Sequence, residues 1–142
     1  MDTKQRGAEA MRRLLNLSPG PDGVFCFNDP MAMGAMKCAL DQGIRIPKDI
    51  AIIGCGNLHY DDSLRVPLSS IDQQSRRTGE EAARVALAIL KSKVAPKPEV
   101  VILQPELIIR GSTRRNGLNK PALGSTPLTN RVAAISRMGL RH

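Results

Sequence analysis

Residues 24–57 read VFCFNDPMAMGAMKCALDQGIRIPKDIAIIGCGN and contain the signals of a strand, a helix and a second strand. The apolar run Val24 to Phe27 predicts a buried strand, and Asn28-Asp29-Pro30 has the residue types of a helix start. Gly43 predicts the end of this helix, and Ile50 to Ile53 form a second short apolar run. A strand–helix–strand order with a long connection predicts a right-handed βαβ unit in a parallel sheet.

The flanking segments add helices and short strands to this unit. Residues 4–17 and 75–93 have apolar side chains at helical spacing, and residues 68–72 predict a third strand. Val100 to Leu103 and Leu107 to Arg110 predict two strands whose tight connection favours antiparallel pairing. The expected fold class is therefore α/β, with a βαβ parallel sheet, flanking helices and an antiparallel strand pair near the end.

The charge of the chain is unevenly distributed. Residues 1–109 hold 14 basic and 13 acidic residues, whereas Arg110 to His142 holds seven basic residues and no acidic one. From Gly111 onward, polar and turn-forming residues predominate, with a possible short helical turn at 131–138. We therefore expect a folded domain over residues 1–113 and a basic, disordered tail over residues 114–142. Such a tail can touch nucleic acid weakly, although a solvated end is the commoner outcome.

The cysteines and the apolar segments bear on the cellular compartment. Cys26, Cys38 and Cys55 are odd in number and lack a C-x-x-C spacing, which argues against a disulfide framework and a four-cysteine zinc site. The first fifteen residues lack the apolar core of a secretory signal, and no stretch is long and apolar enough for a membrane span. We expect a cytoplasmic protein without a membrane segment.

Catalytic, metal and cofactor chemistry is poorly supported by the sequence. There is no G-x-S-x-G elbow, and the only two histidines, His59 and His142, are far apart in the chain. Gly54-x-Gly56 lacks the third glycine of a dinucleotide loop, because His59 stands there. Asp61 and Asp62 are expected to face solvent. We therefore predict no enzyme activity, no metal site and no cofactor.

Asn28 has two competing interpretations. Its side chain carries both a carbonyl acceptor and an amide donor, which suits the recognition of vicinal hydroxyls or of a purine edge. Spacing alone favours a structural role, in which Asn28 or Asp29 caps the helix that follows.

Three segments, taken together, resemble one family. FNDPMAMGAMKCALDQGIRIPKDIAIIG, VPLSSIDQ and LIIRGST are similar to the sensor domain of LacI/GalR regulators, from about Gly7 to Thr113. The resemblance implies part of a type I periplasmic-binding-protein-like domain. It further implies the effector-sensing and dimerisation part of a transcriptional regulator that lacks its own DNA-binding headpiece. Residues 70–93 would then pack in a second lobe that this chain does not contain.

The resemblance also implies which residues bind the effector. Asn28 matches the asparagine that points into the effector cleft, and Gln73 matches a glutamine at the hinge and cleft edge. Gly56 stands where most members have an aspartate, which puts a simple hexose in doubt and shifts the acceptor role to Asn57. The expected effector is small and polar, either a sugar or nucleobase-like.

The family's subunit contact maps onto two segments of this chain, the 30–43 helix and the 58–66 loop. The matching residues are Met33, Lys37, Ser63 and Leu64, although Met33 is equally consistent with an ordinary exposed apolar side chain. A homodimer is the implied assembly. Operator DNA would be contacted only through the headpiece of a full-length parent.

Three other interpretations remain. A solute-binding protein of the periplasmic type would share the architecture, but the absence of a leader argues against it. An enzyme on a doubly wound scaffold lacks a catalytic constellation. A non-functional truncated fragment is the third alternative.

Overall fold

The computed structural model describes residues 2–92, 100–115, 132–136 and 139–141 of the 142-residue chain. This part of the chain forms three helices and six strands. The helices are α1 (Thr3–Leu15), α2 (Asp29–Asp41) and α3 (Ser75–Lys91). The strands are β1 (Gly23–Cys26), β2 (Ala51–Cys55), β3 (Ser69–Asp72), β4 (Glu106–Ile108), β5 (Val132–Ser136) and β6 (Gly139–Arg141).

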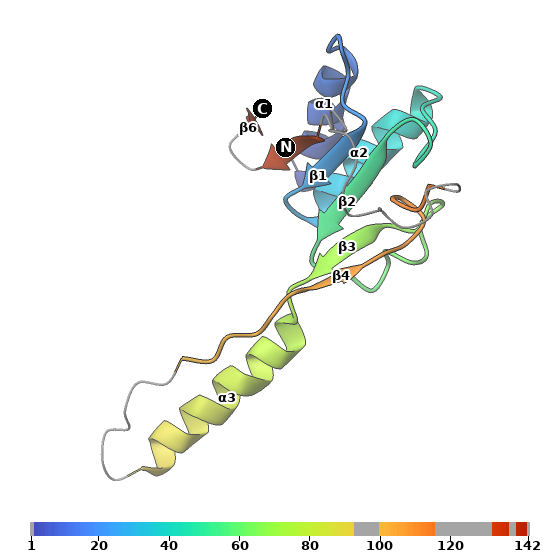
Figure 1. Cartoon of the computed structure of the whole chain (residues 1–142). Coiled ribbons are helices and arrows are strands. Elements are labelled where there is room, and N and C mark those ends of the chain that lie inside the picture. The colour runs from blue at the N-terminus through green and yellow to red at the C-terminus, as the bar shows by residue number, and fades with distance from the viewer. Residues whose placement is uncertain (1, 93–99, 116–131, 137–138, 142) are drawn as a thin grey trace, which may run out of the picture.

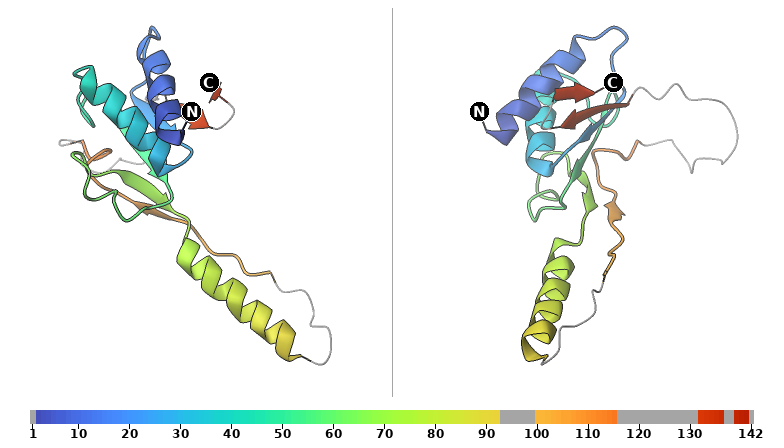
Figure 2. Two further views of the ribbon diagram at one scale, coloured as in Figure 1. Left: turned by 180° about the vertical axis from the view of Figure 1, so that it is seen from behind. Right: turned by 90° about the vertical axis from the view of Figure 1, so that its left-hand side faces the viewer.

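All six strands belong to one sheet in the order β4-β3-β2-β1-β5-β6. The four inner strands run parallel, and β4 and β6 pair antiparallel at the two edges. Helices α1 and α2 lie together against one face of this sheet, which gives two layers (Figures 1 and 2). The predicted α/β class and the βαβ unit are confirmed.

Local sequence signals start both packed helices. In α1, the carboxylate of Asp2 accepts a hydrogen bond from the Gln5 backbone N–H at 2.8 Å, and the Asp2 backbone N–H donates in turn to the Gln5 side-chain Oε1. In α2, Asn28 is the N-cap and Pro30 occupies the first turn, where its missing N–H costs nothing. The amphipathic faces of the helices then decide their packing against the sheet.

The core lies between the two helices and the sheet. Its fully or nearly fully buried side chains are Met11, Leu14, Val24, Met31, Ala32, Ala35, Ile50, Ile52 and Leu68. Two glycines let the helix backbones touch where α1 and α2 cross. A Cβ on Gly34 would lie 1.9 Å from the Lys4 carbonyl oxygen, and one on Gly7 would lie 2.1 Å from that of Met31. No side chain fits at this crossing.

The antiparallel strand pair predicted near the end of the domain is present, but one of its strands is not the predicted one. Val100 to Leu103 forms no strand, and β4 pairs instead with β3, in a register that places Leu107 opposite Ile71. Strand β3 already belongs to a packed sheet, and its free edge offers backbone hydrogen-bond partners to β4. A hairpin built from residues 100–110 alone would be only marginally stable.

The predicted helical turn at residues 131–138 is also wrong where the structure describes it. Val132–Ser136 forms β5, which pairs with β1 and places Val132 opposite Gly23. The β1 edge presents unpaired N–H and C=O groups, and a segment with Val132 and Ile135 has the β-branched residues suited to pairing with it. Residues 116–131 of the predicted tail lie outside the described residues, and the division at residue 113 remains a prediction.

Helix α3 leaves the sheet and projects away from it (Figures 1 and 2). None of its residues is buried, and Leu90 is 80% exposed. Residues 70–93 were expected to pack in another lobe. Ser70–Asp72 instead lies inside β3 of this sheet, so only α3 is consistent with that expectation. No helix in the described ranges is both long and apolar enough to cross a membrane.

The glycine crossing generates the first prediction. Gly34→Ala should lower the free energy of unfolding by about 1–3 kcal/mol, because a methyl group there forces the two helix backbones apart. The matched control is Gly79→Ala in α3, where an added Cβ meets nothing within 4 Å. It should leave stability unchanged or raise it by up to about 1 kcal/mol. Urea unfolding followed by circular dichroism measures both, and equal effects would contradict the proposed backbone contact.

Candidate functional site

The predicted effector residues lie at the carboxyl ends of three neighbouring parallel strands. Asn28 lies just beyond β1, Asn57 just beyond β2, and Gln73 directly after β3. These ends point to the side from which α3 departs (Figure 1). In open α/β sheets this edge is where ligands bind.

Asn28 caps α2, which confirms the structural interpretation of this residue. Its backbone is extended, and its Oδ1 accepts a hydrogen bond from the Met31 N–H at 2.9 Å. The side-chain NH2 group of Asn28 donates to no described residue. The cap therefore uses the acceptor half of the amide and leaves the donor half for another partner.

Asp29 organises the edge, a role that the sequence analysis missed. Its carboxylate is fully buried and accepts hydrogen bonds from the Ser70 hydroxyl at 2.7 Å and from the Leu58 N–H at 3.1 Å. A Cβ on Gly54 would lie 2.1 Å from Asp29 Oδ1, and one on Gly56 would lie 3.0 Å from Oδ2. The Gly-x-Gly sequence therefore makes room for a carboxylate. The sequence pattern that could have indicated this role is the Gly-x-Gly at the end of one strand, together with an aspartate after the preceding strand.

Asn57 reaches the predicted edge, but both polar ends of its side chain are already used. Its Nδ2 donates to Asp72 Oδ2 at 3.0 Å, and its Oδ1 accepts from Arg110 Nη2 at 2.6 Å. Arg110 also donates to the Leu68 carbonyl oxygen at 2.8 Å. An effector that contacts Asn57 would have to replace one of these partners. Arg110, which lies in the LIIRGST segment, was not identified from the sequence.

Gln74, next to the predicted Gln73, makes hydrogen bonds at the point where the chain leaves the sheet. Gln74 is in the left-handed region with φ 53°, and its N–H donates to Asp72 Oδ1 at 2.7 Å. Its side chain donates to the Gln104 carbonyl oxygen at 2.6 Å. Gln73 is exposed and lines the space between α3 and residues 101–103. Two chain segments that leave the sheet are thus tied together by Gln74.

Phe27 is a second residue that the sequence analysis did not assign to the site. It directly precedes Asn28 at the end of β1, and its side chain is 48% exposed. Its exposed ring adds an apolar surface to this end of the sheet.

Asp61 is buried, so the expectation that it faces solvent is wrong, whereas Asp62 is exposed as predicted. Neither carboxyl oxygen of Asp61 has a hydrogen-bond partner within the described part of the chain. Asp61 lies within hydrogen-bonding reach of Asp29, and burial together with the Asp29 charge raises the pKa of Asp61 to about 7. Two buried carboxyl groups therefore meet directly behind the edge.

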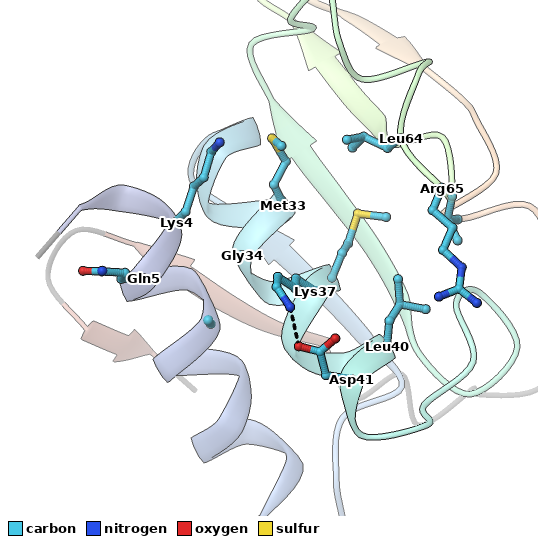
Figure 3. Close-up of a pocket in the computed structure, with 12 residues that line it drawn as sticks. Lys4, Gln5, Met33, Gly34, Lys37, Leu40, Asp41, Leu64 and Arg65 are labelled. Carbon is cyan, nitrogen blue, oxygen red and sulfur yellow. Dashed lines mark hydrogen bonds and ion pairs between the residues drawn. The ribbon is translucent and has the colours of Figure 1, made fainter.

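Three of the four predicted subunit-contact residues line one groove. Met33, Lys37 and Leu64 border a cavity of about 520 Å³ between α1, α2 and the loop before β3 (Figure 3). Lys37 pairs with Asp41 at 2.6 Å on the groove rim. The fourth residue, Ser63, is exposed and does not line this groove; its hydroxyl donates to Asp62 at 3.2 Å.

The cap at Asn28 generates the second prediction. Asn28→Ala should lower the free energy of unfolding by about 1 kcal/mol, because the Met31 N–H loses its acceptor and the buried Asp29 cannot replace it. Asn28→Asp keeps a capping oxygen and should stay within a few tenths of a kcal/mol of the wild type. Urea unfolding of the chain tests both variants. A wild-type stability for Asn28→Ala would show that the cap contributes nothing.

Comparisons with known proteins agree on one family. Residues 1–113 match the family of the periplasmic binding protein-like domain. The HTH-type transcriptional repressor PurR of Mannheimia succiniciproducens is 40% identical over 109 residues, which cover 77% of this chain and 32% of the repressor. PurR of Vibrio parahaemolyticus is 38% identical over 95 residues, or 67% of this chain and 28% of the relative. The chain thus spans about a third of the length of the curated relatives it matches.

Solved structures give the same answer. A LacI family transcriptional regulator from Arthrobacter sp. FB24, in complex with lactose, superposes with a TM-score of 0.72 at 30% identity. That match covers 80% of this chain and 42% of the regulator. A LacI family regulatory protein from Chloroflexus aggregans gives 0.71 at 36% identity, with 79% and 40% covered. The chain therefore belongs to the periplasmic binding protein-like family, in the branch that forms LacI/GalR sensor domains.

Proposed function

We propose that this chain is the effector-sensing and subunit-pairing part of a LacI-type transcriptional regulator. The observation that carries the proposal is the edge at the ends of β1, β2 and β3, where the Asn28 amide donates to no described residue and the preceding residue, Phe27, has an exposed ring. The family relationship supports it, because the matched relatives are named as repressors. Operator DNA would be contacted through a helix-turn-helix headpiece of the full-length protein. Catalysis, a metal and a cofactor have no part in this role, which is exercised in the cytoplasm.

The proposed effector is a small polar molecule of the sugar or nucleobase-like class. The free NH2 of Asn28 requires an acceptor on the effector, and the Phe27 ring suits the apolar face of a sugar or a planar base. Gly56 offers no side chain, so this position supplies no carboxylate for sugar hydroxyls. Two matched regulator structures contain sugars, lactose in one case and cellobiose in the other.

The third prediction tests effector sensing in a graft. Residues 1–113 replace the matching segment of the Mannheimia succiniciproducens repressor, and a reporter strain measures repression against a panel of sugars and nucleobases. We expect one class of compound to change the repression level. In the same graft, Asn28→Asp should weaken that response by about tenfold, because it keeps the cap and removes the donor. A folded, repressing graft that responds to no compound, or responds equally with Asn28→Asp, would contradict the assignment.

The groove between α1, α2 and residues 64–66 of the 58–66 loop is the proposed homodimer contact. Its apolar lining residues are Met33, Met36, Leu40, Leu64 and Val66, and its charged lining residues are Lys4, Lys37, Asp41 and Arg65. Figure 3 shows the groove. An apolar centre with a charged rim is the usual anatomy of a protein interface. The α2 helix and the 58–66 loop would meet their counterparts across a two-fold axis, with Ser63 at the periphery.

The fourth prediction concerns this groove. Met33→Glu should raise the dimer dissociation constant at least about tenfold, because it places a charge at the apolar centre of the contact. The control is Leu17→Glu, which changes an exposed leucine just beyond the end of α1 and outside the groove lining. Sedimentation velocity over a concentration series measures both variants. A wild-type chain that stays monomeric throughout, or a dimer insensitive to Met33→Glu, would refute this contact.

A further inference from the structure

The buried carboxyl groups of Asp29 and Asp61 present an unusual balance of donors and acceptors. Both residues are 0% exposed. Each oxygen of Asp29 receives one hydrogen bond, from Ser70 or from Leu58, whereas the two oxygens of Asp61 receive none from any described residue. Burying a carboxylate without a donor is very costly. The pair therefore lacks one hydrogen-bond donor.

From this geometry we propose that Asp29 and Asp61 share one proton in mildly acidic solution, that they lose it as the pH rises through neutrality, and that this proton holds the 58–66 loop against the sheet. The proton comes from solvent and resides on Asp61, whose O–H then donates to the Asp29 carboxylate. This single proton supplies the missing donor and removes one of two adjacent buried negative charges. Two carboxyl groups this close behave as one titrating unit.

The groups around the pair do not provide an alternative compensation. Arg110 is the cation that acts on Asp61, but its guanidinium already donates to the Leu68 carbonyl and to Asn57. Burial and the Asp29 charge raise the pKa of Cys26 to about 12 and also raise that of Cys55, so both thiols stay neutral. Tyr60 lies in the loop itself, and its pKa is raised by burial and by both aspartates. His59 is exposed and contacts the Tyr60 ring edge-on.

The sign of the pH dependence follows from the geometry. Burial and the neighbouring Asp29 charge raise the pKa of Asp61 to about 7, well above the ordinary value of 3.8. The folded state then binds more protons than the unfolded state between these two values. Stability from this group is therefore greatest in acid and is lost as the pH rises from about 4 through about 7.

The shared proton sits between the two surfaces of the proposed sensor. Asp29 directly follows Asn28 and packs against Gly54 and Gly56 at the effector edge. Asp61 fixes the loop through its backbone, which donates to the Leu58 carbonyl at 3.0 Å and accepts from the Leu68 N–H at 2.8 Å. Leu64, Arg65 and Val66 of that loop line the groove. The link to pairing rests on the proposed function, whereas the shared proton does not.

The chain contains its own reporter for this experiment. Tyr60 is the only tyrosine and there is no tryptophan, so tyrosine emission reports on the residue next to Asp61. All variants carry His59→Gln, which removes the imidazole that contacts the Tyr60 ring, so that the emission reports on the aspartate pair alone. Emission is recorded from about pH 5 to about pH 9, below the range in which the phenol ionises.

The fifth prediction is the result of this titration. The His59→Gln chain should show one transition with a midpoint at about 7. Adding Asp61→Asn should abolish it, whereas adding Asp62→Asn, which changes the exposed neighbour, should leave it intact. A flat titration in the His59→Gln chain, or a transition that survives Asp61→Asn, would overturn the proposal.

A second measurement needs no change at the pair. In the chain labelled with ¹³C at aspartate carboxyl carbons, one resonance should titrate with a midpoint near 7. If every aspartate titrates below about pH 5, as unperturbed carboxyl groups do, the shared proton is refuted even should Asp61→Asn fail to fold. Asp29→Asn removes the other carboxyl group of the pair and should therefore abolish the same titration of the Asp61 resonance near pH 7.

The link to pairing is tested separately. The dimer dissociation constant of the His59→Gln chain should rise severalfold between about pH 6 and about pH 8, and Asp61→Asn should remove this dependence. A pH-independent constant would overturn the link. If the chain neither binds an effector nor dimerises, the tyrosine and ¹³C titrations still decide the shared proton, so the two failures are distinguishable.

Discussion

The buried carboxylate of Asp29 is the constraint on which the edge at the carboxyl ends of β1, β2 and β3 depends. It lies at the start of α2 and receives hydrogen bonds from β3 and from the loop after β2, so one side chain joins three strand ends. Its position leaves no room for a side chain at Gly54. The shape of the proposed effector edge thus follows from the need to satisfy one buried charge.

A second network fixes the last part of the folded domain to this edge. The Arg110 guanidinium donates a hydrogen bond to Asn57, and the Asn57 side chain donates one to Asp72. Asp72 also accepts a hydrogen bond from the Gln74 backbone N–H. Close by, the fully buried Ser112 donates to the Ile52 carbonyl oxygen at 2.6 Å. The LIIRGST segment therefore completes the edge from a distant part of the sequence. Without it, the Leu68 carbonyl and Asn57 would lack the Arg110 donor.

Local signals made much of the fold predictable. Asn28 and Pro30 gave the start of α2, the run after Pro47 gave β2, and the order of these elements gave the parallel sheet. Asn28, Asn57 and Gln73 each follow a strand and therefore lie at one edge of the sheet, whereas their role in effector binding was inferred from the family resemblance and stays a prediction. These inferences require only short stretches of sequence and the geometry of βαβ units.

The other features depend on contacts between distant residues. From the sequence, Asp61 resembles a solvent-exposed aspartate in a loop. The three-dimensional structure shows that it is buried and lies against Asp29. Val100 to Leu103 has strand-forming residues, but the β3 edge is taken by Glu106–Ile108 instead. The pairing of β5 with β1 joins segments that no local pattern connects. Competition for sheet edges and buried partners decides such cases, not propensity.

The lack of buried residues in α3 has a consequence for the time scale of its motions. A 17-residue helix with no buried residue is held mainly by its own backbone hydrogen bonds, which makes it marginal in water. Its amide hydrogens should therefore exchange with solvent deuterium long before those of β1 and β2, which lie inside the sheet. Any partner that covers α3 would slow this exchange selectively, so that the helix itself records when the domain is bound.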